Sequence, residues 1–314
     1  MTLDPKTQAF LDAVAAKGGP PIYTLSYEEA RKVLEDAQAG NAPKAPVQSE
    51  DQTLNTGRGG QVSIRIYRPQ HPTSPPPVVL YYHGGGWVLG SKNTHDRLLR
   101  ALTAASRCAF VFVNYTPSPE AQFPVPLEEA YAALKHIADH PRDFALDGSR
   151  IAVAGDSVGG NMSAAMALLA KERGGPSLRA QALIYPVTDA GMNTGSYREF
   201  ADGPWLTAPA MKWFWDAYAP NTADREKPTA SPLRAADTLL KGLPPALVLT
   251  AENDVLRDEG EDYARKLTAA GVETTAIRYL ATIHDFAMLN GLSETAAAKS
   301  AIQVTAQFLA AALV

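Results

Sequence analysis

Short apolar runs alternate along the chain with longer segments in which apolar residues recur at helical spacing. Alternating apolar and polar positions predict a half-exposed strand at 62–66, and apolar runs predict further strands at 77–82, 109–113, 151–154, 182–185, 246–250 and 274–279. Helical patterns fall at about 95–106, 125–139, 158–173, 259–270 and 294–312. Because strands that alternate with helices build parallel sheets, the pattern predicts an α/β fold, with helices on both faces of a mostly parallel central sheet.

Two stretches interrupt this alternation. The first has helical patterns at 4–16 and from Ser26 to about Gln38, where Ser26 and Glu29 have the spacing of a capping box, and it ends in a proline-containing linker at 40–46. The second, 189–236, lies between two predicted strands and has no strand pattern. It contains a predicted helix at 208–218 and a group of aromatic residues: Trp205, Trp213, Phe214, Trp215 and Tyr218.

Composition narrows the range of partners. A chain of 314 residues, of which 46% are hydrophobic, can bury one large core. The net charge is −4 and there is no basic cluster, which argues against nucleic acid as a partner. No leader pattern and no apolar run of membrane length is found, so we expect a cytoplasmic protein with no membrane partner. The single cysteine, Cys108, is expected to be a buried, inert thiol, and we expect neither a metal nor another cofactor.

The segment Gly155–Asp156–Ser157–Val158–Gly159 lies where a predicted strand turns into a predicted helix. A serine in this context is held on a strained turn with its hydroxyl raised above the sheet edge. Glycines two residues to either side are needed because a Cβ there would collide with the adjoining strand or helix. The pattern also occurs in turns without chemistry, so other residues must decide whether Ser157 is a nucleophile.

Three consecutive glycines follow the predicted strand 77–82, in the segment His83–Gly84–Gly85–Gly86–Trp87. Glycines cost backbone entropy, which indicates that main-chain N–H groups must stay unobstructed here. In acyl transfer, such groups and the N–H of Val158 would bind the oxyanion of the tetrahedral intermediate. The alternative is a flexible glycine hinge, which leaves the presence of both motifs in one chain unexplained.

A serine nucleophile needs a base that is itself oriented by an acid. His284 lies on a loop after strand 274–279, whereas the other histidines fall at positions that favour structural or solvated roles: His71, His83, His95, His136 and His140. Asp254 lies just beyond strand 246–250, while Asp258 and Glu259 stand at the next helix start, where helix capping explains them. The order Ser157, Asp254, His284 is that of the α/β-hydrolases.

With these motifs the chain resembles the hormone-sensitive-lipase-like (family IV) bacterial carboxylesterases of the α/β-hydrolase superfamily, over roughly residues 50–314. The segments 254–260 and 119–124 add to the resemblance. It implies an α/β-hydrolase fold and a serine carboxylesterase that acts on short-chain esters through an acyl-enzyme. It also implies Gly85 and Gly86, beside Val158, as the oxyanion donors. Asp285 stands where glycine commonly follows the catalytic histidine, which brings a carboxylate close to the base.

The resemblance further implies a helical cap over the serine. We expect residues 1–45 to form its N-terminal part and 189–236 its second part, with 46–188 and 237–314 as the catalytic core. Trp87, Trp205 and Phe214 are candidates for the wall of a substrate pocket, although aromatic residues at such spacing are more often packing anchors.

Other functions use similar sequences. The same residues could act in a deacetylase or an amidase, and some relatives of the family are small-ligand receptors that have lost the catalytic histidine. Because Ser157, Asp254 and His284 are all present, we expect a small-molecule ester as the substrate. The alanine-rich final helix could form a dimer or pack on its own sheet, so the sequence is compatible with a monomer or a homodimer.

Overall fold

The computed structural model describes residues 1–40, 42–57 and 60–314. Asn41, which belongs to the predicted linker at 40–46, lies outside the described residues. Within these ranges the strands form one eight-stranded sheet in the order β1-β2-β4-β3-β5-β6-β7-β8. Their bounds are β1 Gln48–Asn55, β2 Gln61–Arg68, β3 Pro77–Tyr82, β4 Ala109–Asn114, β5 Asp147–Asp156, β6 Leu178–Ile184, β7 Ala246–Asn253 and β8 Thr274–Ile283.

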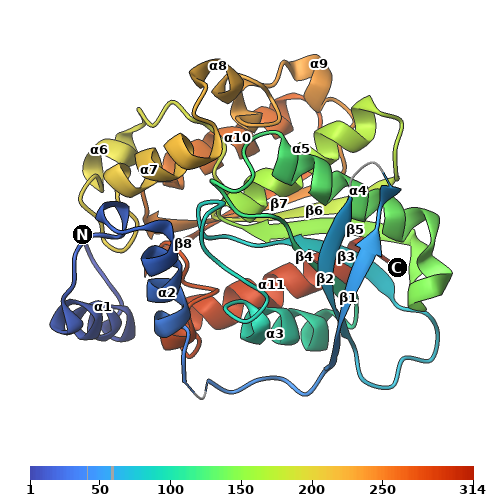
Figure 1. The fold of residues 1–314 in the computed structure, drawn as a ribbon, viewed down its shortest axis with the longest axis horizontal. Helices are drawn as coiled ribbons and strands as arrows, with labels where there is room; N and C mark the ends of the chain where they lie inside the picture. The colour runs from blue at the N-terminus through green and yellow to red at the C-terminus, as the bar shows by residue number, and fades with distance from the viewer. Residues whose placement is uncertain (41, 58–59) are drawn as a thin grey trace.

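The sheet is mostly parallel, as the alternation of elements predicts (Figure 1). β1 and β2 pair antiparallel at one edge, β2 also runs antiparallel to β4, and the remaining pairings are parallel. The sequence pattern does not predict β1, because this polar edge strand buries Leu54 and leaves most of its other side chains exposed. The strand expected at 62–66 is therefore the second strand of the sheet.

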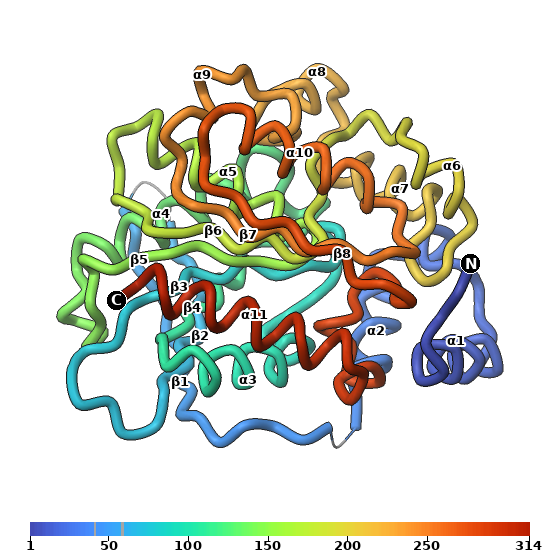
Figure 2. The backbone as a smooth tube through the Cα atoms, turned by 180° about the vertical axis from the view of Figure 1, so that it is seen from behind, coloured from blue at the N-terminus to red at the C-terminus, as the bar shows by residue number. Residues whose placement is uncertain are grey.

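Helices cover both faces of the sheet. Those packed on it are α3 Asp96–Ser106, α4 Val125–Asp139, α5 Val158–Glu172, α10 Arg257–Ala269 and α11 Ala296–Ala312. α3 and α11 lie side by side on one face, and α4, α5 and α10 lie on the other (Figures 1 and 2). The α/β-hydrolase arrangement expected from the motifs is confirmed, and the central strands β3 and β4 are almost entirely buried within it.

Two segments outside these layers lie beside each other. The first contains α1 Pro5–Lys17, η1 Ile22–Thr24 and α2 Tyr27–Ala37, and the second contains α6 Gly195–Glu199, α7 Ala208–Tyr218, α8 Thr222–Arg225 and η4 Pro232–Arg234. Tyr27 stacks on Trp213 with ring centroids 5.0 Å apart, which joins α2 to α7. The capping box of Ser26 and Glu29 is confirmed at the start of α2. The division of the chain into a core and a two-part cap stays a prediction.

Helix α1 lies at one end of the molecule, far from the C-terminus (Figures 1 and 2). Its Phe10 packs on Trp205, with ring centroids 5.5 Å apart, and against Gly291, where an added Cβ would lie 2.6 Å from the phenyl ring. Further short helices in the described part of the chain are η3 Pro141–Phe144, α9 Asp237–Leu240 and η5 Asn290–Leu292. None of the helices in the described ranges is long and apolar enough to cross a membrane.

Candidate active site

Ser157 occupies the sharp turn between β5 and α5. Its backbone has φ +55° and ψ −119°, a conformation that is strained for a residue with a side chain. The Ser157 N–H donates to the Ile184 carbonyl at 2.8 Å, which fixes the turn on the neighbouring strand. A Cβ on Gly159 would overlap the Tyr82 carbonyl oxygen, so the turn can approach β3 this closely because that position is glycine.

The structure brings Ser157, His284 and Asp254 together at the carboxyl ends of β5, β8 and β7. The Ser157 Oγ lies 2.9 Å from His284 Nε2, and His284 Nδ1 lies 2.7 Å from Asp254 Oδ2. The other Asp254 oxygen accepts from the Leu256 N–H at 3.0 Å, which orients the carboxylate. All three side chains are buried, and Tyr185 packs edge-on against the imidazole with ring centroids 4.9 Å apart.

Charges around His284 favour its protonated form. Burial opposes the imidazolium, but the carboxylates of Asp254 and Asp285 outweigh it and raise the pKa of His284 above its ordinary value of 6.5. The nearer oxygen of Asp285 lies 3.4 Å from His284 Nε2. Burial raises the pKa of the Asp285 carboxyl, whereas His284 and the indole N–H of Trp205 act in the opposite direction.

The glycine loop is tied to the serine turn by the buried Asp156. Its Oδ1 accepts from the Gly84 N–H at 3.1 Å and from the Tyr81 hydroxyl at 2.6 Å, and its Oδ2 lies 3.3 Å from His95 Nε2. Burial opposes a charge on Asp156, but His95 and the Tyr81 hydroxyl lower the pKa of this carboxyl below its ordinary value. Because Asp156 directly precedes Ser157, these hydrogen bonds fix the position of the glycine loop relative to the serine turn.

Gly85 and Gly86 follow on this loop with φ +108° and φ +65°. Both residues border the same cavity as Ser157 and His284. Their N–H groups and that of Val158, at the first position of α5, have no hydrogen-bond partner among the described residues. They are therefore free to donate to a bound group.

Among the described residues, the histidine that contacts the Ser157 hydroxyl is His284, whereas His83 packs in the glycine loop. His83 is stacked between Phe112 and Tyr115, with centroid distances of 5.0 and 4.3 Å, and burial together with His95 lowers its pKa to about 3. It is therefore a neutral packing residue of the glycine loop.

A cavity of about 480 Å³ opens above Ser157. Trp205 and Phe214 line it, and their role as a substrate wall stays a prediction. Trp87 is instead fully buried between α7 residues, 4.0 Å from Tyr218 and 4.7 Å from Trp215 by ring centroids, so it is not a wall of this cavity. The Trp87 backbone has φ +59°, and its ring packs on aromatic residues of a distant segment, which the sequence pattern does not predict.

Several lining residues have no signal in the sequence motifs. Helix α1 contributes Leu11, Val14 and Ala15, and the segment up to α2 contributes others: Pro20, Pro21, Ile22, Tyr23, Val33 and Leu34. Asp202, Leu206 and Met211 come from the segment that contains α7. The apolar faces of the N-terminal helices were the available signal, but a helical pattern does not say which distant segment it will contact.

Asp258 and Glu259 lie in the first turn of α10, where the helix dipole favours carboxylates as expected, but their hydrogen bonds go to another segment. The Asp258 carboxylate accepts from the Ser196 N–H at 2.7 Å, and Glu259 Oε1 accepts from the Thr188 N–H at 2.6 Å. Both carboxyl groups thus hold the segment that leads into α6. Burial raises the pKa of Glu259 well above its ordinary value.

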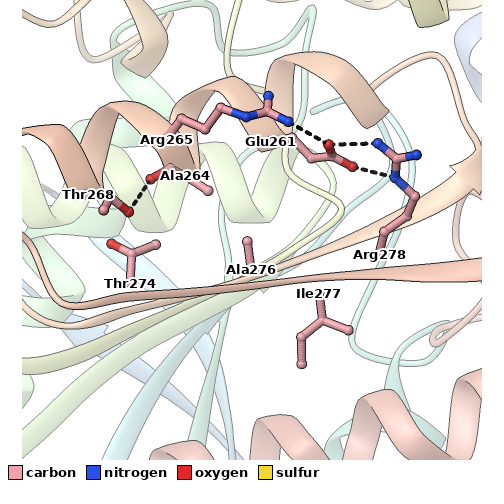
Figure 3. A pocket seen from close by; sticks show the side chains of 8 residues that line it. All are labelled: Glu261, Ala264, Arg265, Thr268, Thr274, Ala276, Ile277 and Arg278. Atoms are coloured by element: carbon pink, nitrogen blue, oxygen red, sulfur yellow. Dashed lines mark hydrogen bonds and ion pairs between the residues drawn. The ribbon is translucent and has the colours of Figure 1, made fainter.

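A second depression, of about 260 Å³, lies between α10 and β8 (Figure 3). Glu261 accepts from Arg278 at 2.6 Å and from Arg265 at 3.1 Å, so the charged side chains of this depression are paired with one another. Its described lining contains no serine, cysteine or histidine. This depression is therefore not a second candidate for the active site.

Comparisons with known proteins agree with this geometry. A family model described as alpha/beta hydrolase fold matches residues 79–288. The chain is 35% identical to an ethyl acetate hydrolase of Pseudomonas putida, over 94% of this chain and 95% of that protein. It is 36% identical to a carboxylesterase of Mycobacterium tuberculosis, over 90% and 88% of the two chains. The crystal structure of a thermostable esterase from Pseudomonas putida ECU1011 superposes with a TM-score of 0.94 at 48% identity, covering 100% of this chain and 98% of that one. The chain therefore belongs to the α/β-hydrolase fold family, among the hormone-sensitive-lipase-like carboxylic ester hydrolases.

Proposed function

We propose that this protein is a serine carboxylesterase that hydrolyses short-chain carboxylic esters through an acyl-enzyme intermediate. Ser157 is the nucleophile, His284 the general base and acid, and Asp254 the acid that orients the imidazole. The observation that carries the proposal is the line of contacts from Ser157 Oγ through the two ring nitrogens of His284 to Asp254, with distances of 2.9 and 2.7 Å. A serine hydroxyl in contact with an oriented imidazole can lose its proton as it attacks an acyl carbon.

In the first half-reaction, His284 Nε2 takes the proton of Ser157 while Oγ attacks the ester carbonyl. Asp254 holds the proton on Nδ1 and stabilises the imidazolium. The imidazolium then protonates the leaving alcohol, and the acyl group stays on Ser157. In the second half-reaction, His284 activates a water molecule that releases the acid and restores the serine.

The backbone N–H groups of Gly85, Gly86 and Val158 stabilise the oxyanion of each tetrahedral intermediate. Support comes from their position beside Ser157 and from the absence of other partners for these donors in the described part of the chain. Preorganised donors of this kind lower the barrier because they need no reorganisation when charge develops. Losing one typically costs about 3 kcal/mol of transition-state stabilisation.

The proposed preference for short esters rests on the limited volume of the cavity above Ser157. The cavity of about 480 Å³ is bordered by apolar side chains of both segments outside the sheet layers, 1–45 and 189–236. We propose that these segments form the cap and that the acyl group binds beneath it. A relative named ethyl acetate hydrolase supports a small acyl group.

Hydrolysis of p-nitrophenyl acetate and butyrate tests this function directly. We expect turnover by the wild type, a loss of at least about a thousandfold in kcat for Ser157→Ala, and wild-type rates for Ser149→Ala, which removes an exposed hydroxyl at the start of β5. An unchanged rate in Ser157→Ala would show that another site carries the activity. Comparable turnover of the matching anilides would favour an amidase instead.

A further inference from the structure

Asp285 and Trp205 form an unusual contact beside the catalytic histidine. The indole N–H of Trp205 donates to Asp285 Oδ2 at 2.9 Å. Both residues have positive φ, +66° for Trp205 and +63° for Asp285. Aspartate tolerates this region, but a tryptophan there is strained, and such strain persists where the surrounding structure requires it. The contact therefore fixes the Asp285 carboxylate at one place in the site.

The second oxygen of Asp285 is left without a partner. Oδ1 is buried and accepts no hydrogen bond from the described residues. It lies 3.4 Å from His284 Nε2, the atom that would hand a proton to the leaving alcohol. Although Oδ1 itself is buried, the Asp285 carboxylate borders the cavity close to the alcohol part of a bound ester, so its charge acts on any charged group there.

The charges around the cavity have one sign. Asp285 and Asp202 line it, and no lysine or arginine is among its described lining residues. The other walls near the serine are apolar or aromatic, including Leu206, Met211 and Phe214. A carboxylate acts strongly on a charged ligand in such surroundings because little water screens it, and aromatic faces also attract cations.

We propose that Asp285 is a specificity-determining residue, which selects esters whose alcohol part carries a positively charged group, such as amino alcohol esters, and disfavours esters with an anionic alcohol part. This inference rests on the proposed esterase function. Asp285 acts on the substrate through the charge that it places at the cavity wall, in addition to its contact with His284.

Matched pairs of neutral and charged esters test the inference. Acetylcholine and 3,3-dimethylbutyl acetate have nearly the same shape and differ in one positive charge, while 3-acetoxypropanoate and 3-methylbutyl acetate differ in one negative charge. The ratio of kcat/KM within each pair is measured for the wild type, Asp285→Asn and Asp262→Asn. Asparagine also tolerates φ +63° and can still accept from Trp205. Asp262→Asn removes a negative charge from an exposed position on α10, outside the cavity lining.

In Asp285→Asn we expect the cationic-to-neutral ratio to fall by about fivefold or more and the anionic-to-neutral ratio to rise, with neither change in Asp262→Asn. Ratios that stay the same in Asp285→Asn, or that change equally in both variants, would overturn the inference. If Asp285→Asn does not fold, Asp285→Gly replaces it, because glycine suits the positive φ. Absence of turnover for the neutral esters in the wild type would instead refute the esterase function itself, so the two failures are distinguishable.

Discussion

The substitution Asp285→Asn should move the pH dependence of catalysis to lower pH. His284 must be neutral to accept the proton of Ser157, so kcat/KM falls as the pH drops through the pKa of this histidine in the free enzyme. The carboxylates of Asp254 and Asp285 raise that pKa above 6.5. Removing the charge of Asp285 removes one of these contributions and makes the imidazolium less stable.

The distance between the charges sets the size of the effect. At 3.4 Å between Asp285 Oδ1 and His284 Nε2, Coulomb's law gives about 1.2 kcal/mol for a water-like dielectric constant and about 5 kcal/mol for an effective value of 20. One pKa unit corresponds to 1.36 kcal/mol. Because the Asp285 side chain is only 14% exposed, water screens it little, so the lower figure is a minimum and we expect a downward shift of at least about one unit.

The assay is kcat/KM for a neutral alkyl acetate between pH 5.5 and 10.5, with the released acid measured by chromatography. The other groups facing His284 are Asp254, Asp156 and Tyr185, and they are the same in both proteins. Asp262→Asn controls for the change in net charge and should leave the pH dependence of kcat/KM unchanged. An acid limb that does not move in Asp285→Asn, or moves to higher pH, would refute the electrostatic reasoning.

Three further predictions follow from individual contacts. Gly86→Ala should lower kcat by at least about a hundredfold and also lower the melting temperature, because the new Cβ overlaps the Phe214 ring and φ is +65°; a folded variant with wild-type kcat would contradict the assigned oxyanion donor. Glu259→Gln should make the free energy of unfolding less dependent on pH. The native pKa of the Glu259 carboxyl is raised, so this group makes the folded protein less stable as the pH rises above the ordinary pKa of 4.5. Chemical denaturation at several pH values measures this dependence. If the free energy of unfolding depends on pH equally in Glu259→Gln and the wild type, the result would contradict the burial of that carboxyl. Leu11→Ala should reduce kcat/KM for hexanoate esters more than for acetates, by about threefold, because one apolar wall of the cavity is lost; equal effects on both would place the acyl group elsewhere.

The sequence was sufficient to select the three side chains that the structure brings together, because each follows a strand. The carboxyl ends of parallel strands meet at one edge of a sheet, so Ser157, Asp254 and His284 could be expected to lie together without knowledge of the strand order. The glycine loop can be placed at the same edge by this argument, because it also follows a strand, β3. The long helices were also predictable, since each has an apolar face toward the sheet.

What the sequence could not supply are contacts that depend on tertiary arrangement. β1 has almost no apolar pattern because it lies at an exposed edge. Trp87 was expected at the cavity, but its ring packs on Trp215 and Tyr218. The sequence also marked Asp285 as unusual, yet its partner Trp205 lies 80 residues away on a different segment. Such pairings are decided by how the segments pack.

The most direct test of the account is the site of covalent labelling by a p-nitrophenyl alkylphosphonate, which mimics the tetrahedral intermediate. We expect one equivalent of phosphonate per chain, found by peptide mass spectrometry on Ser157, with activity lost in proportion to labelling and labelling strongly slowed in His284→Ala. A label on another residue, or esterase activity that survives complete modification of Ser157, would contradict the assignment of Ser157 as the nucleophile.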